Sequence, residues 1–397
     1  MCIPIKIAII SDLHCTNADR ASNATRLHDK TPIKPINRHP VKSIKERINK
    51  DSINANYLIC LGDITDKANE YGLNQGIDYL KEIQTELNAE ELFLVTGNHD
   101  VDTQNTTDPF YRLKSHDFPL SEDSIKSSYW NNHYCVIERE NLILFVINTC
   151  HHIRSIDDLN TPPPFNDDAL LEDIDTKLSQ YKTTNKFKLF LCHHHPLQQS
   201  DYDDKYTKND LIEGADKLLK ILKNNGFHLV LHGHKHIIRI QYNDDLPVFA
   251  SGSFSSIQNT REFDGKNTFH LIDLKIENHQ CKGKITTWFY NFNSGWTKSK
   301  DPESIFPTYT GFGCDHRNIR GICDNIVNYF DNWYKLEDKT KILPFNDILT
   351  YFPDIEYLTP MQQDELMDYF RDQYNLEISP NIKIGATHII KRINDNI

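Results

Sequence analysis

The feature that most constrains this chain is a series of short apolar segments, each followed at once by side chains that can bind a metal ion. Five such segments occur, at residues 5–10, 57–61, 92–95, 187–192 and 228–231. Continuous apolar runs of this length are typical of strands that are buried on both faces of a parallel sheet. Since such strands end at the same edge of a sheet, we expect the polar groups that follow them to gather there.

These polar groups offer oxygen and nitrogen atoms and no thiolates. They are Asp12 and His14, Asp63, Asn98 and His99, one of the three histidines at 193–195, and His234 and His236. In an extended segment, the two-residue spacing of Asp12 and His14 points both side chains the same way, and His234 and His236 repeat it. Even without His99, seven donors exceed what one ion needs, so we expect two divalent ions, Mn²⁺, Fe²⁺ or Zn²⁺, that share a bridging carboxylate.

The segment after the third strand, Gly97-Asn98-His99-Asp100, combines several kinds of chemistry. Asn98 can give a carbonyl oxygen to a metal, and His99 can carry a proton near neutral pH. Asp100 is expected to hold His99 in one tautomer. Alone, this segment could equally be an ordinary turn at the end of a strand.

Taken in order, Asp-x-His, Gly-Asp, Gly-Asn-His-Asp, a strand-ending His and Gly-His-x-His resemble the motifs of the calcineurin-like metallophosphoesterase superfamily. The resemblance covers residues 5–240, and the compact motifs are similar to those of the class III cyclic-nucleotide phosphodiesterase branch. It implies an α/β fold, a four-layer α/β/β/α sandwich with a dimetal site at the strand ends.

The resemblance also implies a role for each motif residue. Asp12, His14 and His236 are implied as ligands of the first ion, Asp63 as the bridge, and Asn98, His194 and His234 as ligands of the second. His194 is chosen among the three histidines because the family ligand lies two residues before the proline, here Pro196. A hydroxide held between the ions is the implied nucleophile, and His99 is implied to protonate the leaving group. Asp63, His99 and Asp100 are therefore the expected catalytic residues.

Two parts are expected along the chain. Residues 1–298 form the metallophosphoesterase domain, in which four strands near 237–241, 248–250, 269–274 and 285–290 are expected to build a second sheet. Residues 299–397 are expected to be mostly helical. From 301 onward there are 16 Asp and Glu against 9 Lys and Arg, a net of −7. This segment either covers a flank of the main domain or binds a protein partner.

Composition limits the possible binding partners and the possible location of the protein. The formal net charge of −12 argues against a surface that coats nucleic acid, although residues 15–50 carry a basic run. That run is either a solvated loop and helix face or a lid over an anionic substrate. No apolar stretch approaches the roughly 18 residues that span a bilayer, and the N-terminus lacks a signal peptide. Nine scattered cysteines without a Cys-x-x-Cys pair favour a reduced, cytoplasmic protein.

Together these features predict a metal-dependent hydrolase of phosphoric esters. The expected substrate is nucleotide-like, with a phosphodiester bond favoured and a phosphomonoester left open. One alternative is a DNA or RNA nuclease of the same superfamily, which the basic run favours and the net charge opposes. The other is a metallo-domain whose access is controlled by a protein partner bound through residues 301–397.

Overall fold

The computed structural model describes residues 3–17, 25–198, 210–257, 267–278, 280–304, 306–314, 318–337 and 342–391. The chain divides into two compact units. The first contains residues 1–271 and 288–297, and the second contains residues 272–287 and 298–397. The chain passes from the first unit to the second between residues 297 and 298, and a β-hairpin contributes the remaining part of the second unit.

Two sheets form the centre of the first unit. One has the strand order β12-β11-β10-β1-β2-β3 and the other the order β4-β5-β6-β7-β9-β8. The bounds in the first sheet are β1 Ile5–Ile10, β2 Tyr57–Cys60, β3 Glu91–Leu94, β10 Thr268–Glu277, β11 Gln280–Asn291 and β12 Gly295–Thr297. Those in the second are β4 Tyr134–Glu138, β5 Leu142–Ile147, β6 Phe187–Leu191, β7 Leu229–His232, β8 Ile238–Asn243 and β9 Leu246–Ser251.

The strands that carry the motifs run parallel to their neighbours. β1 pairs with β2 and β2 with β3, and in the other sheet β5, β6 and β7 pair in the same sense. The carboxyl ends of these strands therefore share an edge in each sheet, as expected from their apolar sequences. The four later strands do not form one sheet, however, because β8 and β9 join β7 whereas β10 and β11 join β1.

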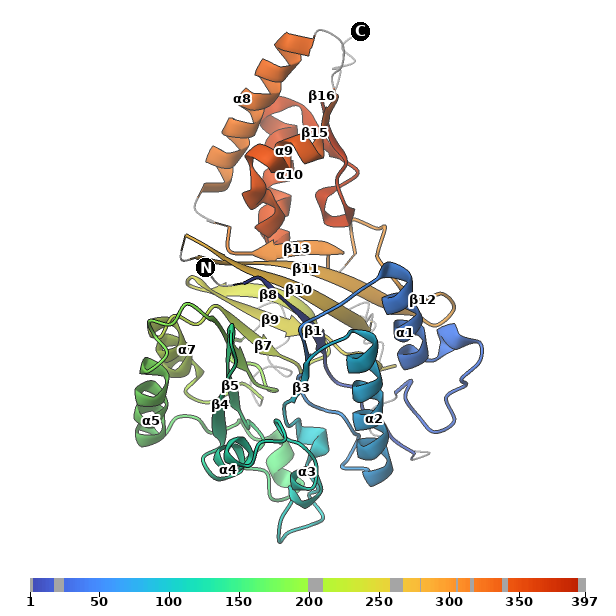
Figure 1. Cartoon of the computed structure of the whole chain (residues 1–397), viewed down its shortest axis with the longest axis vertical. Helices are drawn as coiled ribbons and strands as arrows, with labels where there is room; N and C mark the ends of the chain where they lie inside the picture. Colours follow the sequence, from blue (N-terminus) through green and yellow to red (C-terminus); the bar gives the residue numbers. More distant parts are fainter. Residues whose placement is uncertain are drawn as a thin grey trace. The chain divides into compact units, whose positions relative to one another are not determined.

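Helices cover the outer faces of the two sheets (Figure 1): α1 Pro40–Asp51 and α2 Glu70–Glu86 on one, and α5 Asp168–Ser179 and α7 Ala215–Asn224 on the other. The shorter helices α3 Tyr111–Lys114 and α4 Asp123–Asn131 lie in the segment between β3 and β4. Apolar side chains of α1 and α2 share a core with β1 and β2, and those of α5 and α7 share one with β5 and β6. Figure 1 shows the sheets between these two helical layers, which confirms the α/β/β/α sandwich.

Three side chains of the basic run in the expected insertion are paired with acids. Lys42 and Lys45 on α1 place their Nζ atoms 3.1 and 2.8 Å from Glu82 Oε2 on α2. Arg47 forms an ion pair with Asp51, one turn further along α1, at 3.2 Å. These contacts favour the solvated helix face over the lid for residues 40–51, whereas residues 18–24 lie outside the described part of the chain.

The second unit contains helices, as expected, together with a small sheet. Its elements are β13 Tyr309–Phe312, α8 Ile319–Glu337, β14 Ile342–Pro344, α9 Phe345–Tyr351, α10 Pro360–Tyr374, β15 Leu376–Ser379 and β16 His388–Lys391. β14, β16 and β15 form an antiparallel sheet, and β13 pairs with the part of β11 that belongs to this unit. The helices pack around an apolar core that includes Phe330, Ile348 and Leu366.

In the part of the chain that the structure describes, no helix is long and apolar enough to cross a membrane. All eight cysteines within it are buried.

Candidate metal centre

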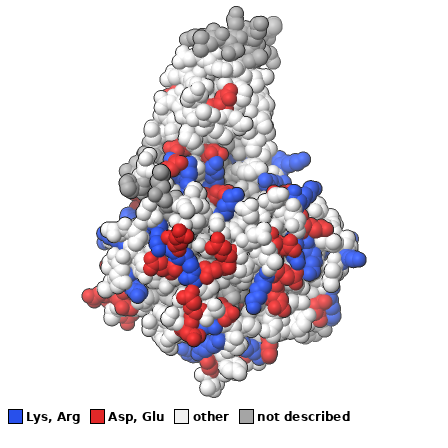
Figure 2. Space-filling model, in the orientation of Figure 1, with Lys and Arg blue, Asp and Glu red and all other residues white. Residues whose placement is uncertain are grey.

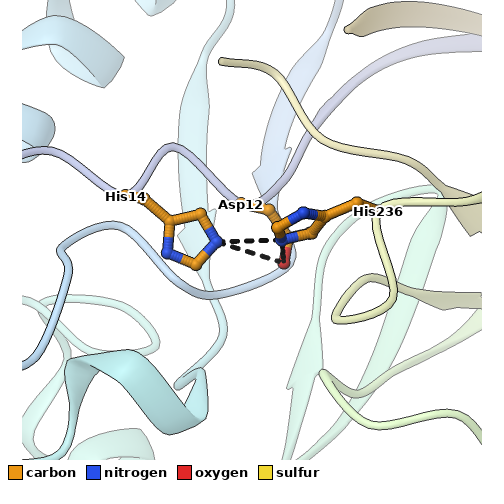
Figure 3. A group of neighbouring side chains, drawn as sticks. All are labelled: Asp12, His14 and His236. Carbon is orange, nitrogen blue, oxygen red and sulfur yellow. Dashed lines mark hydrogen bonds and ion pairs between the residues drawn. The ribbon is translucent and has the colours of Figure 1, made fainter. Parts of the chain in front are cut away.

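Three side chains from two loops form the first group of candidate ligands (Figure 3). Asp12 and His14 follow β1, and His236 follows β7. The Nε2 atoms of His14 and His236 lie 2.9 Å apart, and His236 Nε2 is 3.4 Å from Asp12 Oδ1. All three predicted ligands of the first ion are therefore brought together.

Four residues form the second group, from the loops after β2, β3, β6 and β7. Asn98 Oδ1 lies 3.1 Å from His193 Nε2 and 3.0 Å from His234 Nδ1. His193 Nε2 is also 3.3 Å from Asp63 Oδ2. The sheets contribute equally to this group, since Asp63 and Asn98 come from one sheet and the two histidines from the other.

The structure changes the choice among the three adjacent histidines. His193, and not His194, points its Nε2 into the second group, while its Nδ1–H donates to the Leu61 carbonyl at 2.7 Å. A metal-binding histidine commonly donates its other ring N–H in this way, which leaves a lone pair for the ion. His194 lies beside the group instead, with its Nδ1 2.8 Å from Thr149 Oγ1.

Asp63 lies between the two groups. Its Oδ2 atom is 3.7 Å from His14 Nε2 in the first group and 3.3 Å from His193 Nε2 in the second. Its Oδ1 atom accepts a hydrogen bond from the His99 amide at 2.8 Å, which fixes the rotation of the carboxylate. The position is that of a carboxylate that can reach two ions at once.

The backbone of these loops is unusual. Five candidate ligands have positive φ angles: Asp12 (55°), His14 (49°), Asp63 (52°), His234 (77°) and His236 (58°). The prediction that the two-apart pairs lie in extended segments is therefore wrong. Left-handed residues other than glycine are uncommon in proteins and often mark functional sites.

Close packing of the loops explains why particular glycines occur there. A Cβ atom on Gly97 would lie 2.2 Å from the backbone nitrogen of Asp63 and from its Oδ1. A Cβ atom on Gly233 would lie 2.1 Å from Ser11 Oγ, beside Asp12. Only glycine lets these loops approach the carboxylates so closely.

The sequence analysis missed Asp66, which is the partner of His99. The Nδ1 atom of His99 lies 2.9 Å from Asp66 Oδ1, and this carboxylate is buried. Asp100 was expected in this role but instead accepts hydrogen bonds from the amides of Thr65 and Gly97, both at 2.9 Å. Burial raises the pKa of Asp100 to about 7. Asp66 belongs to the same loop as Asp63, which is the signal that could have indicated it.

The donor set suits divalent metal ions. Burial lowers the pKa of His14 and of His234 to about 3, so both rings are neutral and offer lone pairs. Burial opposes ionisation of Asp63, but the charges of His193 and His99 hold its pKa well below the usual range. A buried anion beside the neutral rings of His14 and His234 is a combination that Mn²⁺, Fe²⁺ and Zn²⁺ bind. The residues present therefore fit a metal centre.

A four-layer sandwich with two such groups at its strand ends defines the class of metallophosphoesterases. Residues 5–237 match the family of calcineurin-like phosphoesterases. Among solved structures, a purple acid phosphatase from yellow lupin (Lupinus luteus) seeds is 12% identical with a TM-score of 0.50, over 80% of this chain and 55% of that chain. A dimetal phosphatase from Danio rerio is 14% identical with a TM-score of 0.45, over 73% of this chain and 100% of that chain.

No curated protein matches the chain. The similarity to the lupin enzyme is one of fold. Because the family match spans more than half of the sequence, the chain belongs to the calcineurin-like phosphoesterase family, and it is a hydrolase that acts on phosphoric esters.

Proposed function

We propose that this protein hydrolyses a phosphodiester bond of a small nucleotide-like substrate at a centre of two divalent metal ions. The observation that carries the proposal is the position of Asp63, whose Oδ2 atom faces both groups of candidate ligands. A carboxylate shared by two ions is the arrangement that phosphoryl transfer with two metals uses.

Two sets of residues would hold the ions. Asp12, His14, Asp63 and His236 would hold the first, and Asp63, Asn98, His193 and His234 the second. When bound, such ions supply an activated water and neutralise charge on the phosphoryl oxygens. The chain itself orients two of these ligands. The His99 amide donates a hydrogen bond to Asp63, and the Leu61 carbonyl accepts one from His193.

His99 is proposed as the proton donor to the leaving oxygen. Its ring lies 4.8 Å from the His14 ring, so it stands at the edge of the ligand groups. Burial lowers its pKa, but the charge of Asp63 and the hydrogen bond to Asp66 outweigh this, and the net effect raises the pKa of His99. Because Nδ1–H donates to Asp66, the protonated ring presents Nε2–H to the substrate. Such general acids typically accelerate hydrolysis by about 10²–10⁴-fold.

A small substrate is favoured over a long nucleic acid. The cationic groups of Lys42 and Lys45 pair with acids of α2, and Figure 2 shows basic and acidic side chains intermixed on the face drawn. The similarity of the compact motifs to the cyclic-nucleotide branch supports a diester. The burial of all the described cysteines supports the proposed reducing, cytoplasmic location.

The test is a product assay with the full chain loaded with Mn²⁺. The panel contains cyclic nucleotides, a generic phosphodiester, a generic phosphomonoester, and single- and double-stranded DNA. We expect turnover of the small diesters, and we expect Asp63→Asn to abolish it while the protein keeps its fold by circular dichroism. Turnover confined to monoesters or to DNA would refute the proposed substrate class. An active, metal-replete Asp63→Asn protein would refute the bridging role.

A further inference from the structure

A pocket with a volume of about 280 Å³ lies in the first unit, and none of the candidate metal ligands lines it. Its lining includes Asp108, Lys114, Trp130, His133, His151 and Arg154. Four of these six side chains are of basic types and one is acidic, in a chain whose net charge is −12. We call this the β5 pocket, because Asn148, His151 and Arg154 of its lining come from the loop that follows β5.

The β5 pocket lies on the same sheet edge as the metal centre. His151 and Arg154 follow the carboxyl end of β5, just as His193 follows the carboxyl end of the parallel neighbour β6. Neighbouring strands are about 4.8 Å apart, so the loop that carries His151 and Arg154 and the loop that carries His193 leave the sheet side by side. The Thr149 hydroxyl joins the two loops through its contact with His194.

The pocket carries an excess of hydrogen-bond donors. Lys114 is paired with Asp108 at 2.8 Å, which leaves Arg154 as the main positive charge. Arg154 forms no ion pair with a carboxylate in the described ranges; its Nη1 donates to the Ile153 carbonyl at 3.2 Å. The remaining N–H groups of its guanidinium can serve a ligand, since this side chain has five donors in a planar fork.

Aromatic pairs form the rest of the lining. The rings of His133 and His151 stack at 4.1 Å, and the Nδ1–H of His151 donates to the Asn148 carbonyl at 2.9 Å. The Trp130 ring lies 5.5 Å from the Phe110 ring. Arg154 therefore supplies the charged donors of the pocket, and its planar fork matches the acceptor oxygens of a phosphate or a carboxylate.

We propose that the β5 pocket is a subsite for a second anionic group of the substrate, separate from the phosphoryl group that is cleaved. The inference rests on the proposed function, because it assigns the substrate of that same metal centre. It predicts a substrate with two acidic groups, such as a diester that ends in a phosphate. Arg154 is then a specificity-determining residue that pairs with the distal anion.

A packing role for Arg154 is the competing explanation. Its guanidinium lies over the Phe110 ring at 5.4 Å, and this contact could by itself account for the side chain. A packing role predicts that loss of Arg154 affects all substrates equally. A subsite predicts that only substrates with a distal anion are affected.

The experiment compares two p-nitrophenyl alkyl phosphodiesters of equal length, one ending in a phosphate and one in a hydroxyl. Wild type, Arg154→Gln, Arg154→Lys and Trp130→Phe are assayed as full chains with Mn²⁺. Arg371→Gln, an exposed arginine of the second unit, is the matched control. We expect Arg154→Gln to raise KM for the phosphate-ended diester by about 10-fold, with kcat and the hydroxyl-ended diester almost unchanged. Arg154→Lys should recover part of the loss, and Trp130→Phe, which keeps an aromatic ring in the lining, should leave KM almost unchanged for both diesters.

Binding of the phosphate-ended diester, measured by calorimetry in Ca²⁺ in place of Mn²⁺, separates the two proposals. Hydrolysis of both diesters without dependence on Arg154 overturns the subsite and leaves the proposed function standing. Binding that requires Arg154 without any hydrolysis supports the subsite and overturns the proposed function. Absence of both overturns both. If inorganic phosphate changes the turnover of the hydroxyl-ended diester through Arg154, the pocket is an effector site, and the substrate assignment is refuted.

Discussion

Two regions of this protein use their backbones differently. In the strand-end loops of the first unit, five candidate metal ligands have positive φ angles. In the second unit, the residues other than glycine that share this property in the described ranges are Asn278 and Asn375. Asn375 ends α10 in the left-handed cap position, which asparagine tolerates well.

The difference shows how the backbone of each region affects the free energy of folding. A left-handed residue with a Cβ atom costs roughly 1–2 kcal/mol, so the loops hold the ligands at the expense of folding free energy. The second unit follows local rules instead: Thr359 caps α10 and forms a capping box with Gln362. We therefore expect substitutions in the loops to change activity, and substitutions in the second unit to change stability.

The largest effect is expected from removing residues 298–397. Residues 272–287 belong to the second unit, where β11 pairs with β13, so truncation exposes their apolar side chains, such as Leu274 and Ile285. We expect an aggregated protein, measured by size-exclusion chromatography. The control also replaces residues 272–287 with a short Gly-Asn turn between Leu271 and Trp288, and it should be soluble.

A soluble and fully active simple truncation would contradict this prediction. It would instead favour the alternative that residues 301–397 are a separate module that binds a protein partner.

His99→Gln should lower kcat by about 10²–10⁴-fold, because it removes the proton for the leaving oxygen. The loss should be greatest for an alkoxide leaving group and small for p-nitrophenolate, which leaves without a proton. Asp66→Asn should lower kcat by about 10-fold, since it weakens the orientation of His99 without removing it. Equal losses for both leaving groups would show that His99 has another role.

A decrease in pH is expected to have a moderate effect on the stability of the first unit. Burial lowers the pKa of His39, His228 and His270 in the first unit to about 4. Between about pH 6.5 and pH 4 the unfolded chain binds more protons at these sites than the folded unit, so stability is complete above this range and falls as pH decreases through it. Acid titration should therefore unfold the first unit before the second.

Tryptophan fluorescence can follow this order, because Trp130, Trp288 and Trp296 lie in the first unit and Trp333 in the second. A Trp333→Phe variant reports on the first unit alone. A single transition shared by fluorescence and circular dichroism would show that the two units unfold together.

The smallest effect is expected from Thr359→Ala, which removes the cap of α10. The free energy of unfolding should fall by about 1 kcal/mol, measured by urea denaturation, while kcat stays unchanged. Thr359→Ser keeps the hydroxyl and serves as the control. A change in kcat would contradict the expectation that substitutions in the second unit change stability and leave activity unchanged.

Patterns local in the sequence predicted much of this structure. The apolar runs marked the strands that end in ligands, and Thr359-Pro360 marked the start of α10. The family motifs also indicated Asp12, His14, Asp63, Asn98, His234 and His236, which the structure brings together.

Apart from the left-handed backbone of the ligand pairs, the errors concern contacts between distant segments. Nothing in the three adjacent histidines indicates that the Leu61 carbonyl, from the other sheet, orients His193. The partner of His99 is Asp66, 33 residues earlier, and not its neighbour Asp100. The four later strands divide between two sheets. The alternation of apolar and polar residues within a strand does not indicate which sheet that strand joins.

The left-handed ligand positions have a consequence for protein engineering. Glycine adopts positive φ without penalty, so Asp12→Gly or His236→Gly should relieve backbone strain while it deletes a ligand. A thermostability screen without an activity filter would reward these changes. Optimisation of this chain for stability alone would thus remove its metal ligands first. An inactive relative with glycines at these positions would be an example of such a loss.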